Sequence, residues 1–206
     1  MNSKANLKTP KNAKAAEPQS PLATFFEYLE LFAWTFFAVM MLLTFVFKIC
    51  RVDGNSMENT LKNGENLLVW GIGYTPEQDD IVVFHLPEKE GQSALVKRVI
   101  ATGGQTVTID FHNKVILVDG VRYEDSHAVL KTASDAKIGR YTLYAEYSYD
   151  ADTKIFSATV PEGHVFVMGD NRNNSKDSRD TEIGFVDERC VLGKALVRIF
   201  PPTFYP

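Results

Sequence analysis

Apolar and polar positions divide this chain of 206 residues into three stretches of different character. Residues 1–21 carry lysines among small and polar residues, with too few apolar side chains to offset the entropy of ordering. A long uncharged run, 31–47, reaches the ~20 residues of a membrane span when it is extended back to Phe25. The pattern therefore predicts a disordered tail (1–21), a transmembrane helix (22–49) and a β-rich domain (50–206).

The apolar run fits a retained membrane anchor better than two alternatives. A cleaved signal peptide has a shorter core and an Ala-x-Ala-like exit, whereas this run ends in Phe47-Lys48-Ile49-Cys50. A buried core helix is less consistent with a run that is apolar on all faces. Lysines in the preceding tail favour a cytoplasmic N-terminus. We therefore expect one pass through a lipid bilayer.

After the anchor, short apolar runs are separated by turn residues such as Gly103-Gly104, His112-Asn113 and Asp119-Gly120. Alternating residues between Tyr141 and Tyr149 predict one further strand. The apolar runs are Leu67–Trp70, Ile81–Phe84, Ala94–Ile100, Val107–Phe111, Val115–Val118, Val165–Met168 and Val191–Phe200. Because no strong helical period follows the anchor, we expect a mostly β fold, a barrel or folded sheet rather than α/β.

Composition narrows the possible partners. The formal net charge is −4 with acids and bases mixed, which argues against nucleic acid as a partner, since phosphate binding needs a strongly basic surface. Cys50 and Cys190 allow one disulfide at most, and we expect two unpaired thiols. No His and Cys cluster has the spacing of metal ligands, so we expect neither a metal nor a cofactor.

The stretch Asp53–Leu61 holds the candidate nucleophile, Ser56. Gly54 permits a backbone angle that other residues avoid, and Asp53-Gly54-Asn55 is a turn signal. A serine just past such a turn can present its hydroxyl and its backbone N–H to one carbonyl, which pairs a nucleophile with an oxyanion donor.

A serine nucleophile needs a base, and Lys97 is the main candidate. Leu95, Lys97 and Val99 share one face of a strand, so the lysine can be desolvated. Burial lowers a lysine pKa by up to about 3–5 units and makes the amine a usable base. The alternatives are a lysine that extends past an edge strand into water, and one of the four histidines as the base: His85, His112, His127 or His164.

The polar segment 169–180 is the third element of the candidate site. It is too polar to be core, and it is either a solvated loop or a set of groups that brace the site. In the second case, Asp170 and Asp177 can both pair with Arg179.

Together these motifs resemble bacterial type I signal peptidase. The segment 56–61 resembles its serine box, and 97–104 its lysine box. The segment 80–84 matches a strand motif between them, and 169–179 resembles the Gly-Asp-Asn-Arg box. The match extends over about residues 25–200, with the motifs in the family's order.

The resemblance implies an antiparallel β-sheet, barrel-like peptidase domain on the outer face of the bacterial cell membrane. Its partners would be the signal peptides of exported preproteins, cut after small-x-small sites. Ser56 would attack the scissile carbonyl and Lys97 would take its proton. Ser175 would orient Lys97, and the Ser56 backbone N–H would be an oxyanion donor. Structural support would come from Asp170, Asp177 and Arg179.

Five apolar residues match the positions that line the family's substrate pockets; each is also a candidate for plain core. They are Val52, Met57, Leu61, Leu95 and Val96. Two positions in the serine turn depart from the family pattern. Asn59 replaces the usual proline, and Gly54 stands where some members carry a serine hydroxyl as the second oxyanion donor.

Two rival functions share parts of this pattern. A Ser/Lys self-cleaving repressor-type protein has a similar β fold, but the membrane anchor and the lack of a DNA-binding region argue against it. A membrane-tethered binding module would not need Ser56, Lys97, Ser175, Asp177 and Arg179 together.

Overall fold

The computed structural model describes residues 20–58, 60–86, 94–124, 126, 147–180 and 182–205. Most of the expected tail, Asn59, His127 and the first half of the strand expected at 141–149 lie outside these ranges. The chain divides into two compact units, with the boundary after Leu43.

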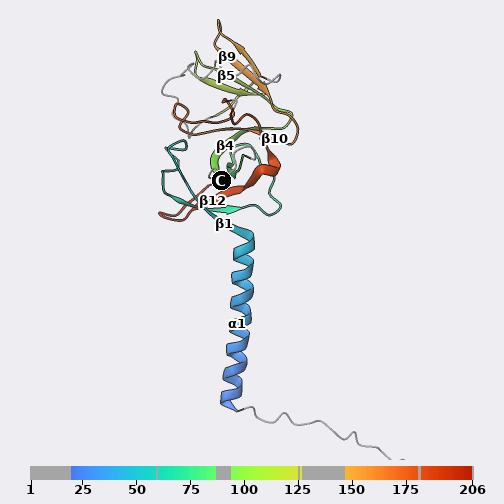
Figure 1. Ribbon diagram of the computed structural model, residues 1–206, viewed down its shortest axis with the longest axis vertical. Coiled ribbons are helices and arrows are strands. Elements are labelled where there is room, and N and C mark those ends of the chain that lie inside the picture. Colours follow the sequence, from blue (N-terminus) through green and yellow to red (C-terminus); the bar gives the residue numbers. More distant parts are fainter. Residues whose placement is uncertain are drawn as a thin grey trace, which may run out of the picture. The chain divides into compact units, whose positions relative to one another are not determined.

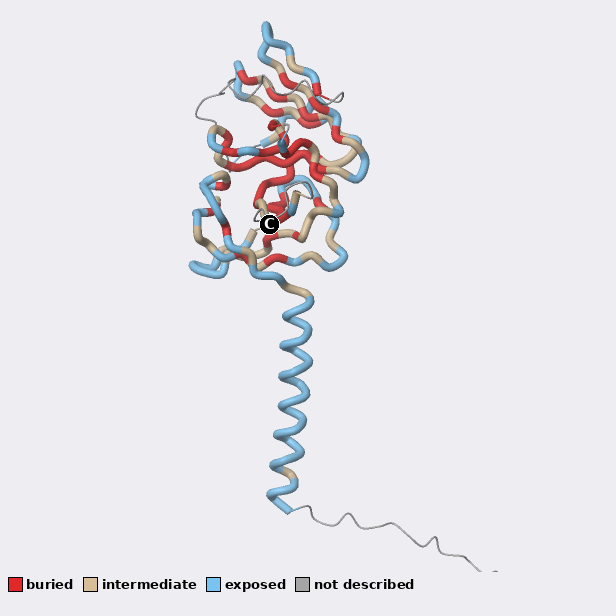
Figure 2. The backbone as a smooth tube through the Cα atoms, in the orientation of Figure 1, coloured by how far each residue is buried: buried red, intermediate tan, exposed pale blue. Residues whose placement is uncertain are grey.

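The first unit is dominated by helix α1, Pro21–Val46, which continues to the start of the first strand (Figure 1). The most apolar 18-residue window of this 26-residue helix has a mean hydropathy of 2.0. None of the residues of the helix is buried (Figure 2). At 1.5 Å per residue the helix is about 39 Å long, which exceeds the ~30 Å hydrocarbon layer of a bilayer. The expected segment 22–49 contains most of this helix and the first three residues of the strand that follows.

The described residues of the second unit form two antiparallel sheets, so the expected mostly β fold is confirmed. The first sheet has the order β1-β2-β12-β3-β4-β10-β11, with β13 paired to β12. Its strands are β1 (Phe47–Arg51), β2 (Asn66–Trp70), β3 (Ile81–Phe84), β4 (Leu95–Thr102), β10 (His164–Met168), β11 (Val186–Asp187), β12 (Val191–Arg198) and β13 (Thr203–Phe204). A short 3-10 helix, Glu188–Cys190, precedes β12.

The second sheet has the order β7-β6-β5-β9-β8. Its paired strands β5 and β9 are labelled in Figure 1. Its strands are β5 (Thr106–Asp110), β6 (Val115–Val118), β7 (Val121–Arg122), β8 (Tyr147–Asp150) and β9 (Ile155–Thr159). Alternation of buried and half-buried residues along β5 and β6 follows the two-residue period that marks a sheet with one face on the core. Strand β8 is the described part of the strand expected between 141 and 149.

Buried residues are concentrated along the strands of both sheets (Figure 2). One cluster joins the far end of β4 and β10, through Ile100 and Phe166, to Val107 and Phe156 of the second sheet. The first sheet is buried on both faces, because Val83 and Val96 belong to one cluster while Val82 and Val99 belong to another. The apolar runs of β3 and β4 are continuous for this reason.

Candidate active site

Two buried apolar side chains and a backbone hydrogen bond fix the conformation of the serine turn. Met57 and Leu61 are both fully buried in the core beside β2 and β3. The Leu61 amide donates to the Met57 carbonyl at 2.8 Å, which closes one helical turn after Ser56. Gly54 has a φ of +89°, a left-handed conformation that favours glycine, as expected from the turn signal. Ser56 is therefore fixed between a glycine turn and two buried anchors.

The polar segment 169–180 is attached to the serine turn directly. The Asn171 amide donates to the Ser56 carbonyl at 3.0 Å, and the Asn171 side-chain amide donates to the Asn55 carbonyl at 3.0 Å. Gly169 allows this approach, since a Cβ there would lie 2.4 Å from the Ser56 carbonyl oxygen and 2.2 Å from Ser175 Oγ. The segment is thus a bracing loop and not a solvated one.

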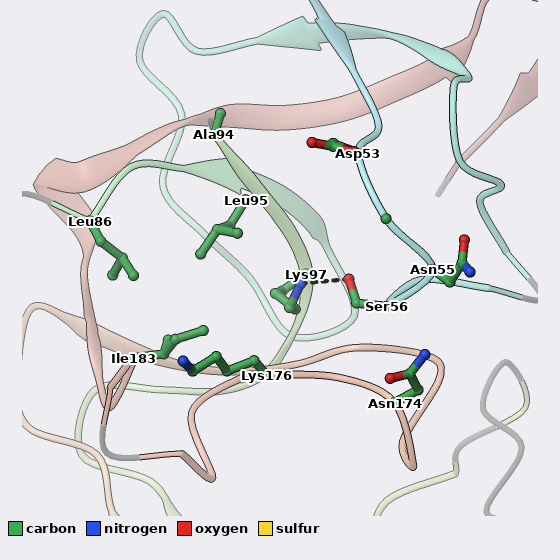
Figure 3. Close-up of a pocket in the computed structure, with 11 residues that line it drawn as sticks. Asp53, Asn55, Ser56, Leu86, Ala94, Leu95, Lys97, Asn174, Lys176 and Ile183 are labelled. Carbon is green, nitrogen blue, oxygen red and sulfur yellow. Dashed lines mark hydrogen bonds between the residues drawn. The ribbon is translucent and has the colours of Figure 1, made fainter. Parts of the chain in front are cut away.

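Lys97 lies on β4, an interior strand between β3 and β10, and is 2% exposed. Its Nζ donates to Ser56 Oγ at 2.7 Å (Figure 3). It also donates to the Val96 carbonyl at 2.9 Å. The neighbouring Leu95 and Val99 pack against one apolar cluster, in line with the shared face expected from the sequence. The alternative of a lysine that extends past an edge strand into water is therefore wrong.

Burial lowers the pKa of Lys97 from 10.5 to about 8. The negative charges of Asp177 and Asp170 act in the opposite direction and raise this pKa, so they limit the decrease. With a pKa of about 8, roughly one molecule in ten carries a neutral amine at pH 7. A neutral amine 2.7 Å from a hydroxyl can accept its proton.

Asp177 is tied to Arg179, as expected. Arg179 Nε donates to Asp177 Oδ1 and Nη2 donates to Oδ2, both at 2.8 Å. Burial by itself raises the pKa of Asp177, but the Arg179 charge and hydrogen bonds from Arg179, the Gly169 amide and the Ser175 side chain hold this pKa below its ordinary value. Asp177 is therefore an ionised group next to Ser175, and the role of Ser175 in orienting Lys97 stays a prediction.

Asp170 does not pair with Arg179, so one of the two pairings considered from the sequence is wrong. Its carboxylate accepts from Arg98 Nε at 2.9 Å and from Arg98 Nη2 at 2.7 Å, with both side chains at most 2% exposed. The Thr60 hydroxyl also donates to Asp170. Arg98 follows the candidate base in the chain, but strand alternation points its side chain to the other face, and its partner lies 72 residues away. Sequence reasoning missed Arg98 because a local pattern does not reveal such a partner.

A cavity of about 400 Å³ opens beside Ser56 and Lys97 (Figure 3). It is lined by the serine turn, by residues between β3 and β4 and at the start of β4, by the bracing loop and by Ile183 just after that loop. The lining residues are Asp53, Gly54, Asn55, Ser56, Leu86, Ala94, Leu95, Lys97, Asn174, Lys176 and Ile183. Among the described histidines, His85, His112 and His164 are not in this lining.

Of the five residues expected to line substrate pockets, Leu95 borders this cavity. The structure places the other four in the buried core next to the serine turn: Val52, Met57, Leu61 and Val96. The sequence did not single out Leu86, Lys176 or Ile183, which complete the wall. Leu86 and Ile183 lie outside the recognised motifs, and Lys176 lies inside the 169–179 motif at a position with no pattern of its own. Only folding brings these three residues to the cavity beside Ser56.

Within the described ranges, no group of three or more His, Cys, Asp or Glu side chains is arranged to hold a metal ion. Cys50 and Cys190 are both free thiols, so the expected absence of a disulfide between them agrees with the structure.

Comparison with known proteins gives concordant matches. The family model described as "Signal peptidase, peptidase S26" matches residues 25–200. "Probable signal peptidase I-1" of Synechocystis sp. is 35% identical over 174 residues, covering 80% of this chain and 76% of the relative. "Signal peptidase IB" of Staphylococcus aureus is 32% identical over 181 residues, covering 85% of this chain and 89% of the relative.

Among solved structures, a signal peptidase I from Enterococcus faecalis V583 is 31% identical, with a TM-score of 0.39. The match covers 59% of this chain and 97% of that one. The family model alone extends over most of the chain. This chain belongs to the signal peptidase family, peptidase S26.

Proposed function

We propose that this protein is a membrane-bound serine endopeptidase that removes N-terminal signal peptides from exported preproteins, with Ser56 as the nucleophile and Lys97 as the base. One observation carries the assignment of roles: the Nζ of a fully buried lysine, with a pKa lowered to about 8, lies 2.7 Å from the Ser56 hydroxyl oxygen. A nucleophile in hydrogen-bond contact with a tuned base is the arrangement that acyl transfer requires.

The reaction runs in two steps. Ser56 Oγ attacks the scissile carbonyl while neutral Lys97 accepts the hydroxyl proton, and Lys97 then donates that proton to the departing amine. This leaves an acyl-enzyme on Ser56. Water attacks the acyl group with Lys97 again as the base, which releases the signal peptide with a new carboxylate. The Ser56 backbone N–H is one oxyanion donor in both steps. Gly54 has no side-chain hydroxyl that can act as a second oxyanion donor.

Three side chains keep the dyad in place without contacting the substrate. The carboxylate of Asp177, ionised through Arg179, holds the Gly169 amide at 3.0 Å, next to Ser175. Ser175 is 2% exposed, and its Oγ lies next to Gly169, at which an added Cβ would meet both Ser175 Oγ and the Ser56 carbonyl oxygen. Ser175 in this position orients Lys97 once the amine has lost its proton.

The substrate is the segment just beyond the apolar core of a signal peptide, cut after a small-x-small site. The length and hydropathy of α1 support a single membrane pass. The N-terminus lies in the cytoplasm and the peptidase domain on the outer face, where exported chains emerge. Protease added outside spheroplasts should therefore digest the domain that begins at residue 50.

The full-length protein in detergent, mixed with a preprotein, tests the proposal. Cleavage after a small-x-small site is expected, identified by mass spectrometry of the mature N-terminus. Ser56→Ala and Lys97→Met should each lower kcat by roughly a thousandfold or more while the β-domain stays folded by circular dichroism. Ser148→Ala, an exposed serine on β8, and Lys114→Met, an exposed lysine before β6, are the matched controls.

The outcomes also separate the rival functions. Full activity in Lys97→Met, with loss on substitution of a histidine, would replace the dyad with a Ser-His arrangement. Cleavage of the protein's own chain and of no preprotein would indicate a self-cleaving protein. Binding of a signal peptide without cleavage, unchanged in Ser56→Ala, would indicate a binding module.

A further inference from the structure

Lys176 is a cation in the wall of the catalytic cavity that has no part in the proposed dyad. It follows Ser175 in the bracing loop and lines the same cavity as Ser56 and Lys97. Figure 3 shows its side chain along one wall, with its amine directed toward Ile183 and away from Asn174.

When Lys97 is neutral and ready to act as the base, few formal charges face this cavity. The remaining charged side chains in the lining are Asp53, in the serine turn, and Lys176, in the bracing loop. The rest of the wall is apolar or uncharged. A ligand in the cavity therefore meets a positive charge on the side of Lys176.

Lys176 pairs with Glu182, and this pair is open to exchange. The two side chains are 45% and 42% exposed, so water screens their attraction. Exposed ion pairs contribute little net free energy, because water competes for both groups and both side chains lose rotamer freedom. A carboxylate of the substrate can therefore take the place of Glu182 with little loss.

The surroundings of Lys176 favour a carboxylate on an aliphatic stem. Leu86, Leu95 and Ile183 provide apolar wall in the same cavity, and Lys176 itself carries a four-carbon stem. A glutamate side chain matches this combination, since its methylene groups can contact the apolar wall while its carboxylate reaches the ammonium.

From this arrangement we propose that Lys176 determines specificity, and that the cavity prefers peptides with an acidic side chain close to the scissile bond. The preference rests on the proposed peptidase function and adds to the selection of small residues at the cut. Basic side chains at the same position are disfavoured, because two like charges then meet at the wall.

Matched peptides that differ only by Glu or Gln at one position, scanned across the residues on both sides of the cut, test the proposal. For the wild-type protein, kcat/KM should be about threefold higher for Glu than for Gln at one position. The ratio should fall to about one in Lys176→Met, which keeps the stem. It should rise in Glu182→Gln, which removes the competing carboxylate. Lys114→Met, an exposed lysine outside this cavity, should keep the wild-type ratio.

The salt dependence of the Glu/Gln ratio tests the proposed contact between Lys176 and the substrate carboxylate independently. Raising sodium chloride from about 0.05 to 0.5 M should reduce the Glu/Gln ratio, because the Debye length shortens several-fold. The proposal is overturned if no position shows a preference, or if the preference persists in Lys176→Met. The all-Gln peptide distinguishes failure of the specificity proposal from failure of the proposed peptidase function. If every variant cleaves this peptide, the peptidase function stands whatever the Glu/Gln ratio is. If the wild type does not cleave it, both proposals are refuted.

Discussion

Arg98 and Asp170 form a two-point ion pair in the interior of the β-domain, with N–O distances of 2.9 and 2.7 Å. The pair joins β4, one residue after the proposed base, to the start of the bracing loop. Because Thr60 donates to the same carboxylate, the serine turn is joined to it too. Arg98 Nη1 also donates to the Asp79 carbonyl at 2.8 Å. One buried arginine thus couples the three segments that make up the site.

Arg98→Met should reduce the free energy of unfolding by about 3–5 kcal/mol, because it leaves the Asp170 carboxylate buried without a countercharge. Urea unfolding of the detergent-solubilised protein, followed by Trp fluorescence, measures the change. The double variant Arg98→Met/Asp170→Leu should recover part of the loss, since no buried charge then remains. Arg189→Met removes the exposed pair with Asp187 and should leave the midpoint unchanged. Equal effects of Arg98→Met and Arg189→Met would contradict the coupling role.

Activity should depend on pH through the proposed base. Because only neutral Lys97 accepts the Ser56 proton, kcat/KM should fall tenfold per pH unit on the acid side, with a midpoint near the lowered pKa of about 8. Steady-state cleavage of a peptide between pH 6 and 10 measures this profile. A profile that stays flat down to pH 6, or a midpoint near 10.5, would be inconsistent with a buried lysine base.

The lowered pKa of Lys97 also predicts how stability depends on pH. Between pH 8 and 10.5 the unfolded chain binds a proton at Lys97 that the folded chain does not, so this residue makes stability rise with pH across that window. Below pH 8 its unfavourable contribution is fully present. Lys97→Met should therefore stabilise the protein at pH 7 by up to about 3 kcal/mol, with the advantage shrinking toward pH 10.5. Denaturant midpoints at pH 7 and 10 give the comparison, and a variant less stable at pH 7 would refute the argument.

Gly169→Ala should impair the site by steric conflict. The added Cβ would lie 2.2 Å from Ser175 Oγ and 2.4 Å from the Ser56 carbonyl oxygen, so one of these segments must shift. We expect a loss of kcat of roughly a hundredfold and a destabilisation of about 1–3 kcal/mol. Activity assays and urea unfolding of the same preparation measure both.

Gly54→Ala is the matched control for this steric effect. A Cβ at Gly54 meets nothing within 4 Å, so the substitution introduces only the strain of a φ near +89°. It should destabilise the protein by about 1 kcal/mol and leave more activity than Gly169→Ala. The reverse order of activity would show that the Gly169 contacts are not limiting.

Local patterns predicted most of the longer elements of this protein, but not all of them. The all-apolar run predicted α1, and the runs that became β2, β3, β4, β6, β10 and β12 were read within a few residues of their bounds. Strand β9 was not predicted, and the start of β1 was assigned to the helix because the apolar run continues to Phe47. Strands β7, β11 and β13 were missed because two residues carry too little periodicity. The candidate pair, Ser56 and Lys97, also came from local signals, namely a turn rich in small and polar residues and a lysine flanked by apolar residues.

Only the tertiary structure decided how these elements meet. The partner of Asp170 is Arg98, not the nearby Arg179, because β4 and the bracing loop are adjacent in the fold and strand alternation turns Arg98 inward. Val52 and Val96 resembled pocket residues in the sequence, yet they fill the core, while Lys176 lines the cavity. A sequence pattern records the period of one element and hence which side chains share a face. What that face contacts depends on pairings between residues far apart in the chain, which no local period encodes.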